Sequence, residues 1–551
     1  MERIWLRSYP PDVPHEIAPD SLQPLPDLLM ERAARYADRR AFSSFGTHVT
    51  YAEFVALSDA LAAWLQNRAG LKKGDRIAIM LPNLVQQPVA VTAALRLGLV
   101  IVNINPLYTP RELKHQLGDA GVQAIIIWDK VSAALGAIIG ETSLNCVIVT
   151  GTTDLLTPDP PAPAADAHLG PYVAFTDALS EGRDLPWTPA QVDVADPAFL
   201  QYTGGTTGLS KGAVLTHANM SANMRQTLLT LQGRLDDEGQ VIITALPLYH
   251  IFALTVNFLC CFDVGGTNVL IANPRDFPGF VQELGRWRFN FITGVNTLYN
   301  ALLNTPGFDA LDFSALHTSI AGGMAMHTAV AERWQRVTGC FVNEGYGLSE
   351  TSPVLCVNLD SSAGFTGSIG LPVPSTDICI RDEQGNDVPY GQPGELCARG
   401  PQVMSGYWGN ESATRQVMTA DGFFRTGDIA IMDERGFVRI IDRKKDMILV
   451  SGFNVYPNEV EEVAAEMDGV LECACVGSPD PDSGECVTLF VVAQPGAGLA
   501  ADQVRAWCRE RLAPYKVPAR IRFIPELPKS TVGKILRREL RTLAGTDDAP
   551  A

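Results

Sequence analysis

The sequence has little positive charge for its size and no long apolar run. Its 551 residues carry 43 Lys and Arg against 61 Asp and Glu, a formal net charge of −18 at pH 7. Because nucleic-acid binding depends on clustered positive charge, a nucleic-acid partner is excluded. The longest apolar run, residues 251–262, contains Thr255 and Asn257 and is shorter than the roughly 20 residues of a membrane-spanning helix. We therefore expect a soluble chain.

An export signal and a cysteine framework are also missing. The first residues, MERIWLRSYPPDVPHEI, carry charge and proline where a secretory signal needs an apolar core of roughly 7 to 15 residues. The 11 cysteines are odd in number, and none form a C-x-x-C pair. We expect reduced, buried thiols rather than a zinc site or disulfides, and a cytoplasmic location.

The standard nucleotide motifs are absent, but one segment has the composition of a phosphate site. Residues 202–217, YTGGTTGLSKGAVLTH, match neither the P-loop, nor the dinucleotide fingerprint, nor the nucleophile elbow. They nevertheless place three glycines, three threonines, a serine and Lys211 within ten residues after an apolar strand. Backbone N–H groups, hydroxyls and a cation then converge on one loop, which predicts a phosphate cradle. The alternative is a flexible Gly/Thr loop.

Two further segments are candidates for nucleotide contacts. In residues 343–350, NEGYGLSE, two glycines flank Tyr346 and leave its ring free to lie against a base, while Glu350 could hold a divalent cation. In residues 421–428, DGFFRTGD, a carboxylate such as Asp428 can accept both hydroxyls of a ribose, and Arg443 follows in DRKKD. Read singly, the first segment also fits a tight turn and DRKKD a solvated linker.

A basic segment lies near the end of this acidic chain. Residues 528–540, PKSTVGKILRREL, place Lys534 beside a glycine. A cation held over a polyphosphate would stabilise the charge that develops during phosphoryl or nucleotidyl transfer. The alternative is an ordinary basic tail. His250, between apolar residues in LPLYHIFAL, is by itself more typical of a structural histidine.

The order of the expected elements predicts an α/β fold with several units. Before a Pro- and Ala-rich loop at residues 151–170, β-branched runs alternate with helical patterns, which is typical of a parallel sheet flanked by helices. The same alternation returns between residues 196 and 350 and predicts a second α/β unit. From residue 364 onwards, short strands and Gly/Pro turns predict a small β-rich unit, and an α+β domain of about 110 residues is expected to begin near Arg443.

Taken together, the motifs resemble the adenylate-forming superfamily of acyl-CoA synthetases, luciferase and peptide-synthetase adenylation domains. The similarity is greatest to bacterial long-chain fatty-acid:CoA ligases. It runs from NPLYTPREL at residues 105–113 through DRKKDMILVSGFNVYPNEVE to the closing GKILRREL. The resemblance implies a large N-terminal domain, residues 1–442, made of two α/β subdomains and a small β-barrel-like subdomain. This domain is hinged to a small, mobile α+β C-terminal domain, residues 443–551.

The resemblance also implies a reaction in two steps. A fatty carboxylate attacks ATP to give acyl-AMP and pyrophosphate, and the CoA thiol then displaces AMP to give acyl-CoA. ATP and CoA are co-substrates and Mg²⁺ is the metal. Other hypotheses are an acyl-AMP ligase, a relative that activates medium-chain, aryl or amino acids, or a silent nucleotide-binding protein. Peripheral contact with the inner face of the cytoplasmic membrane and a homodimer are further hypotheses.

Each matching position inherits an expected role. The catalytic residues are Lys534, His250 and Lys211, the metal ligands are Thr203 and Glu350, and Lys445 is the hinge. Gly452 and Phe453 are expected to face the pantetheine channel of CoA. The expected nucleotide contacts are Tyr202, Thr203, Gly204, Gly205, Thr206, Thr207, Gly208, Lys211, Gly323, Glu344, Gly345, Tyr346, Gly347, Asp428 and Arg443.

Overall fold

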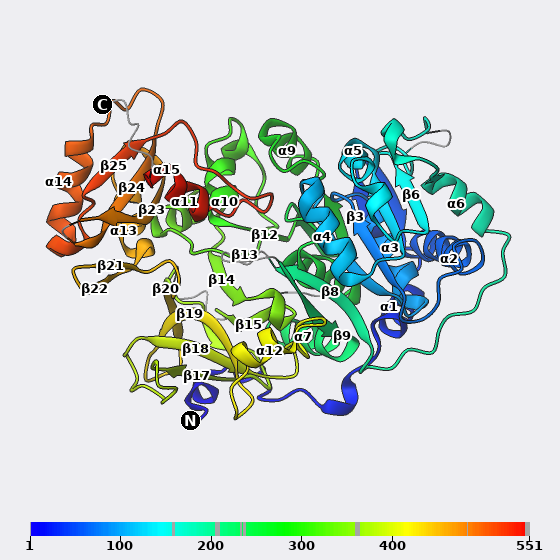
Figure 1. Cartoon of the computed structure of the whole chain (residues 1–551), viewed down its shortest axis with the longest axis horizontal. Helices are drawn as coiled ribbons and strands as arrows, with labels where there is room; N and C mark the ends of the chain where they lie inside the picture. Colours follow the sequence, from blue (N-terminus) through cyan, green and yellow to red (C-terminus); the bar gives the residue numbers. More distant parts are fainter. Residues whose placement is uncertain are drawn as a thin grey trace.

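Two large, mainly parallel sheets form the body of the molecule (Figure 1). The structure is a computed structural model that describes residues 2–156, 160–203, 210–231, 234, 239–358, 364–481 and 483–545. The first sheet contains, in spatial order, β7 (Val173–Ala174), β6 (Cys146–Thr150), β5 (Ala124–Trp128), β3 (Arg76–Met80), β4 (Val100–Asn103), β8 (Pro197–Thr203) and β9 (Lys211–Thr216). The second contains β16 (Leu371–Pro372), β15 (Val354–Val357), β14 (Val342–Gly347), β13 (Thr318–Gly322), β12 (Phe291–Gly294), β10 (Val241–Thr244), β11 (Thr267–Leu270), β1 (Arg40–Ser44) and β2 (Thr47–Thr50).

The two α/β units of the sequence prediction are confirmed, but their division along the chain is different. The prediction assigned residues 196–350 to the second unit, whereas β8 pairs in parallel with β4 through Ile101 and Phe199 in the first sheet. Conversely, β1 pairs with β11 in the second sheet, with Phe42 opposite Asn268. The residues of a strand determine which of its side chains are buried. The sheet that it joins depends on partner strands that are distant in sequence, so the sequence pattern could not assign β1 and β8 to their sheets.

Helices cover both faces of the first sheet because apolar side chains alternate along its strands. On β3, Ile77 and Ile79 belong to a core cluster that continues into the second sheet. The neighbouring residues Ala78 and Met80 belong to a separate cluster on the other face. The main helices of this body are α1 (Leu25–Arg35), α2 (Tyr51–Asn67), α3 (Gln86–Arg96), α4 (Pro110–Ala120), α5 (Ser132–Gly136), α6 (Phe175–Gly182), α7 (His217–Thr230), α8 (Cys261–Asp263), α9 (Phe277–Leu284), α10 (Asn296–Leu303) and α11 (Thr328–Thr338).

Local sequence signals fix the ends of several of these helices. Thr50 and Glu53 form a reciprocal capping box at the start of α2. Thr109 and Glu112 do the same for α4, whose first residue is a proline. Such boxes satisfy backbone N–H groups that a helix leaves unpaired at its start.

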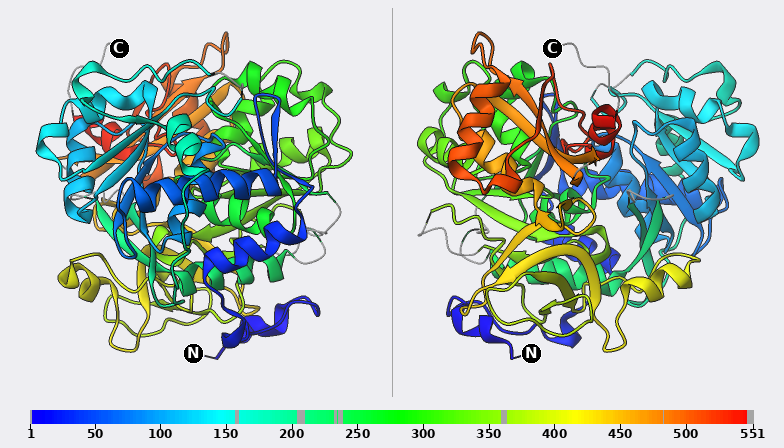
Figure 2. Two further views of the ribbon diagram at one scale, coloured as in Figure 1. Left: turned by 90° about the vertical axis from the view of Figure 1, so that its right-hand side faces the viewer. Right: turned by 60° about the vertical axis from the view of Figure 1, so that its left-hand side comes forward.

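A smaller antiparallel sheet packs below the two large ones (Figure 2). It is ordered β17 (Asp377–Arg381), β18 (Gly394–Arg399), β19 (Phe424–Met432) and β20 (Val438–Arg443), with helix α12 (Glu411–Val417) between β18 and β19. The predicted β-rich unit is therefore confirmed. Trp5, near the N-terminus, is only 1% exposed and packs against this sheet. The start of the chain therefore contacts the small sheet.

The last part of the chain forms a C-terminal unit, residues 448–545, at the side of the second sheet (Figure 1). Its elements are β21 (Ile448–Val450), β22 (Phe453–Val455), α13 (Pro457–Ala465), β23 (Val470–Asp480), β24 (Gly484–Ala493), α14 (Ala501–Arg511), β25 (Arg520–Phe523) and α15 (Arg537–Gly545). The predicted domain boundary between Asp442 and Arg443 falls one residue before the end of β20, and it stays a prediction.

The apolar run at residues 251–262 is a buried helix. Ala253–Cys260 forms a π-helix in which every residue is buried, including Thr255 and Asn257. Within the described ranges, no helix is long and apolar enough to cross a membrane. All 11 cysteines are free, and all except Cys146 are buried, as the sequence predicted.

Candidate active site

A cleft of about 1260 Å³ lies where both large sheets, the small sheet and the C-terminal unit meet. Strands and loops that are distant in sequence supply its walls, with Thr203 at the end of β8, Tyr346 in β14 and Asp428 in β19. Fourteen of the predicted site residues line it: Tyr202, Thr203, Lys211, His250, Gly323, Glu344, Gly345, Tyr346, Gly347, Glu350, Asp428, Arg443, Lys445 and Lys534.

The other seven predicted site residues fall into two groups. Gly204, Gly205, Thr206, Thr207 and Gly208 lie outside the described residues. Gly452 and Phe453 lie at the β21–β22 hairpin. Phe453 is 56% exposed and stacks on Tyr515, with ring centroids 4.9 Å apart. In this conformation the hairpin lies outside the cleft wall.

One wall of the cleft joins an aromatic ring, a carboxylate and a guanidinium. The Tyr346 hydroxyl donates a hydrogen bond to Asp428, with 2.5 Å between the oxygens. Asp428 and Arg443 are opposite each other on β19 and β20, and Arg443 Nε lies 3.3 Å from Asp428 Oδ1. Burial, followed by the charge of Asp428, raises the pKa of Tyr346. This wall offers an aromatic face, an acceptor for hydroxyls and a cation.

Lys534 reaches the cleft on a loop from the C-terminal unit. A Cβ placed on Gly323 would lie 2.9 Å from Lys534 Cε and 3.3 Å from Nζ, so the lysine stem lies directly over that glycine. Burial, followed by the positive charge of Arg443, lowers the pKa of Lys534 to about 8, while Asp428 and Glu350 act in the opposite direction. A partly buried ammonium without a full counter-charge is suited to an anionic ligand.

His250 lies near this lysine. Burial, followed by the positive charge of Lys534, lowers the pKa of His250 to about 3. The ring is therefore neutral at neutral pH, and its Nδ1 accepts a hydrogen bond of 3.3 Å from the Phe252 backbone N–H. With Nδ1 accepting, the neutral ring carries its proton on Nε2 and can donate one hydrogen bond from that atom without adding charge.

The opposite side of the cleft carries Glu350 and Lys211. Glu350 is 8% exposed, and its Oε1 accepts a hydrogen bond of 2.8 Å from the Tyr407 hydroxyl. Lys211 Nζ lies 5.2 Å from the centroid of the same tyrosine ring, within the range of a cation–π contact. Tyr407 therefore orients both charged groups. Sequence reasoning missed it, because SGYWGN has no recognisable motif.

Glu344 is a second buried carboxyl group in the cleft wall. Its Oε1 accepts a long hydrogen bond of 3.4 Å from the Met326 N–H, whereas Oε2 has no hydrogen-bond partner among the described residues. Burial raises the pKa of Glu344 to about 8, and the Met326 N–H opposes the shift. The group is therefore mostly protonated at neutral pH and can donate a hydrogen bond into the cleft.

One arm of the cleft is apolar. Its side chains belong to a single buried cluster against which Phe252 packs, and Phe252 limits the space around Gly322, where a Cβ would lie 2.9 Å from the ring. The apolar lining residues of this arm are Leu231, Phe252, Val256, Ile320, Val354 and Val357. Such a surface favours an apolar ligand group by about 0.8 kcal/mol for each CH₂ it buries.

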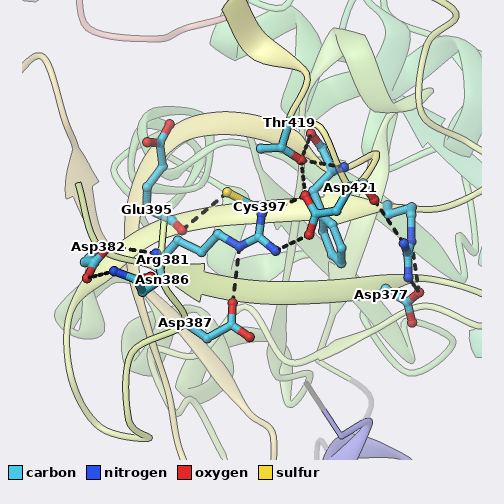
Figure 3. Close-up of polar contacts among 11 residues, drawn as sticks. Asp377, Arg381, Asp382, Asn386, Asp387, Glu395, Cys397, Thr419 and Asp421 are labelled. Atoms are coloured by element: carbon cyan, nitrogen blue, oxygen red, sulfur yellow. Dashed lines mark hydrogen bonds and ion pairs between the residues drawn. The ribbon is translucent and has the colours of Figure 1, made fainter. Parts of the chain in front are cut away.

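A second hollow, of about 460 Å³, lies on the small sheet around Arg381. Figure 3 shows Arg381 between Asp387 and Asp421; its Nε lies 3.2 Å from Asp387, and its Nη1 lies 3.0 Å from Asp421. Arg399 similarly binds Asp377, at 2.9 Å. These arginines already have carboxylate partners, so the hollow is explained as a network of surface ion pairs, each of which contributes little to stability.

Comparison with known proteins identifies the family that this fold and cleft define. Residues 29–408 match the model described as AMP-binding enzyme, and residues 459–534 match the AMP-binding enzyme C-terminal domain. The chain therefore belongs to the AMP-binding enzyme family. It is 50% identical to a long-chain-fatty-acid–CoA ligase of Escherichia coli O6:H1 and 36% identical to one of Bacillus subtilis, with 98% of both chains covered in each case. The predicted membership of the adenylate-forming superfamily, near the bacterial long-chain ligases, is confirmed.

Solved structures support the same fold. ATP-bound MatB from Rhodopseudomonas palustris matches with a TM-score of 0.82 and 30% identity, covering 94% of this chain and 98% of that one. The o-succinylbenzoate CoA synthetase of Bacillus subtilis, in complex with its acyl-adenylate intermediate, matches with a TM-score of 0.79 and 27% identity, covering 96% and 99%. The predicted α/β class with a smaller C-terminal domain is thereby confirmed.

Proposed function

We propose that the chain is an AMP-forming long-chain fatty-acid:CoA ligase. In the first step an oxygen of the fatty carboxylate attacks the α-phosphorus of ATP, and the bond to pyrophosphate breaks. In the second step the CoA thiol, after losing its proton, attacks the acyl carbon, and AMP leaves. The observation that carries the proposal is the position of Lys534, an ammonium in a cleft that also contains the Tyr346–Asp428–Arg443 wall. The 50% identity to named ligases supports the substrate class.

The cleft provides separate places for the parts of the substrates. Tyr346 is assigned to the adenine ring, and Asp428 with Arg443 to the ribose. The apolar arm is assigned to the acyl chain, with His250 at its mouth. Lys534 then lies where a carboxylate and the α-phosphate must approach each other. Because both groups are anions, a cation held there offsets their repulsion, and the shared orientation lowers the entropic part of the barrier.

The proposed reaction also requires Mg²⁺, for which the cleft contains two candidate ligands. Thr203 and Glu350 both line the cleft and supply hard oxygen donors, the type that Mg²⁺ prefers together with phosphate oxygens and water. No group of three or more His, Cys, Asp or Glu side chains suitable for a metal occurs in the part of the chain that the structure describes, so phosphate oxygens of ATP and water would supply the other ligands. When bound, Mg²⁺ neutralises phosphate charge. Titration calorimetry should show Glu350→Gln weakening the Mg²⁺ dependence of ATP binding.

The proposal also divides the chain into a body, residues 1–442, and a mobile domain, residues 443–551, that turns about Lys445. Lys534 is in the cleft, whereas Gly452 and Phe453 are outside it, which suits the first step. We expect the hairpin to replace the Lys534 loop before the thiol enters. A spectroscopic distance between labels on the two domains should change when acyl-AMP and CoA replace ATP.

The location and assembly of the enzyme are part of the same proposal. We assign it to the cytoplasm, with peripheral contact at the inner face of the cytoplasmic membrane, because its fatty-acid substrate partitions into bilayers. We also expect a homodimer. Fractionation at low salt tests the membrane contact, since recovery of all activity in the soluble fraction contradicts it. Light scattering of the purified chain tests the dimer.

A further inference from the structure

The loop that delivers Lys534 is held from outside the cleft as well as from inside it. This delivery loop, residues 530–534, is a closed turn in which the Ser530 N–H donates to the Lys534 carbonyl over 2.7 Å, and the Lys534 N–H donates to Ser530 Oγ over 3.1 Å. These two bonds close the turn on itself. In Figure 1 this part of the chain, coloured red, extends from the C-terminal unit towards the second sheet.

Thr297 binds the back of this loop. It is the second residue of α10 and is 8% exposed, and its hydroxyl donates a hydrogen bond of 2.8 Å to the Gly533 carbonyl. Gly533 packs closely against the large body, because a Cβ on Gly533 would lie 2.8 Å from Thr297 Oγ1 and 3.0 Å from Val295 Cγ2. Gly533 also has a φ of +77°, which favours glycine. The bond joins the body to the residue that precedes Lys534.

Two residues in the loops that follow β4 and β10 contact the tip of the loop. Asn105 Nδ2 donates a hydrogen bond of 3.0 Å to Thr531 Oγ1, and Asn105 is itself fixed by accepting from the Leu107 N–H at 3.0 Å. Burial raises the pKa of Tyr249 to about 12, and a hydrogen bond to Thr531 opposes the shift. These contacts and that of Thr297 join the loop to the large body in this conformation.

We infer that Thr297 is a positioning residue for the first half-reaction, acting as a latch that holds Gly533 and thereby places Lys534 over Gly323. The inference rests on the proposed function. A bond present in only one of two conformations favours that conformation by its own free energy. Loss of the latch should therefore slow adenylation and leave the second half-reaction, for which the loop must leave, unchanged or faster.

The test compares Thr297→Val with two matched variants. Valine keeps the size and removes the donor, whereas Thr297→Ser keeps the hydroxyl. Thr305→Val removes a similar bond, 2.8 Å to the Ala301 carbonyl, just beyond the other end of α10. We measure palmitate-dependent ATP–pyrophosphate exchange and, separately, thioester formation from supplied palmitoyl-AMP and CoA. We expect Thr297→Val to slow the exchange about two- to tenfold, the range for one net hydrogen bond, with the serine variant near the unmodified enzyme.

The outcomes separate the inference from the proposed function. Equal losses in both half-reactions, or equal effects of Thr297→Val and Thr305→Val, would overturn the latch. Absence of exchange in the unmodified protein with any fatty acid would overturn the proposed function, and the latch with it. If Thr297→Val does not fold, as judged by its melting temperature, Thr531→Val replaces it and removes the loop hydroxyl that Asn105 binds. That variant must reduce adenylation selectively for the inference to stand.

Discussion

Replacing Lys534 by alanine removes the cation that the C-terminal unit places over Gly323. At about 4 Å and an effective dielectric constant of about 20, one unit charge is worth roughly 4 kcal/mol to a developing anion. Loss of a single oriented stabiliser in other enzymes costs about 10²- to 10³-fold. We therefore expect palmitate-dependent ATP–pyrophosphate exchange to fall by at least about 10²-fold. Thioester formation from supplied palmitoyl-AMP should survive, because the proposed domain movement takes the lysine out of the cleft before that step.

The control is Lys114→Ala, which removes a half-exposed lysine paired with Glu141 and should change neither half-reaction. Equal damage to both half-reactions by Lys534→Ala would refute the reasoning, since it would mean that the lysine supports the whole fold or both steps. The melting temperatures of the two variants distinguish loss of folding from loss of chemistry.

The pKa of Lys534 gives the same prediction a pH dependence. Burial, followed by Arg443, lowers this pKa to about 8 in the free enzyme, so the ammonium is present below pH 8 and is lost as the pH rises through that value. The adenylation kcat/KM for ATP, which reports the free enzyme, should therefore fall above about pH 8. In Lys534→Arg the guanidinium keeps its charge, so the alkaline limb should move upwards or disappear. If the alkaline fall in kcat/KM is unchanged in this variant, the fall belongs to the titration of another group.

Two other substitutions test the cleft wall and the space over it. Gly323→Ala should slow adenylation more than tenfold, because its Cβ would lie 2.9 Å from Lys534 Cε. Gly339→Ala is the control, since it has a similar φ, +74°, with nothing within 4 Å of the added carbon; similar exchange rates in the two variants would contradict the steric argument. Tyr346→Phe should raise the KM for ATP about tenfold, because Asp428 loses a donor, and binding of ATP measured by calorimetry should weaken equally. Unchanged affinity would show that the Tyr346 hydroxyl does not support nucleotide binding through Asp428.

The sequence was sufficient for the parts of the site that lie in continuous segments. Tyr346 stands between two glycines and Lys534 beside one, and such local patterns identify a residue without its partners. The role of His250 could be interpreted only with the fold, because an apolar sequence context is as typical of a structural histidine as of one in an active site. His250 lies near Lys534, a residue distant in sequence. The positive charge of Lys534 is the second cause, after burial, of the lowered pKa of His250.

The parts that could not be predicted depend on pairs of residues that are distant in sequence. Tyr407 and Glu350 are 57 positions apart, and Thr297 and Gly533 are 236 apart. Neither hydroxyl is marked by a motif, because a single hydrogen bond between units has no local pattern. The assignment of β8 to the first sheet is of the same kind, since its partner Ile101 is decided by packing.

The most direct measurement of the central claim is product formation by the purified enzyme with ATP, Mg²⁺, palmitate and CoA, each omitted in turn. We predict pyrophosphate release that requires palmitate and ATP, together with palmitoyl-CoA and AMP formed in equal amounts only when CoA is present. Consumption of ATP with palmitate but no transfer to CoA would contradict the ligase and favour an acyl-AMP ligase. No pyrophosphate with any carboxylate would contradict the adenylation step itself.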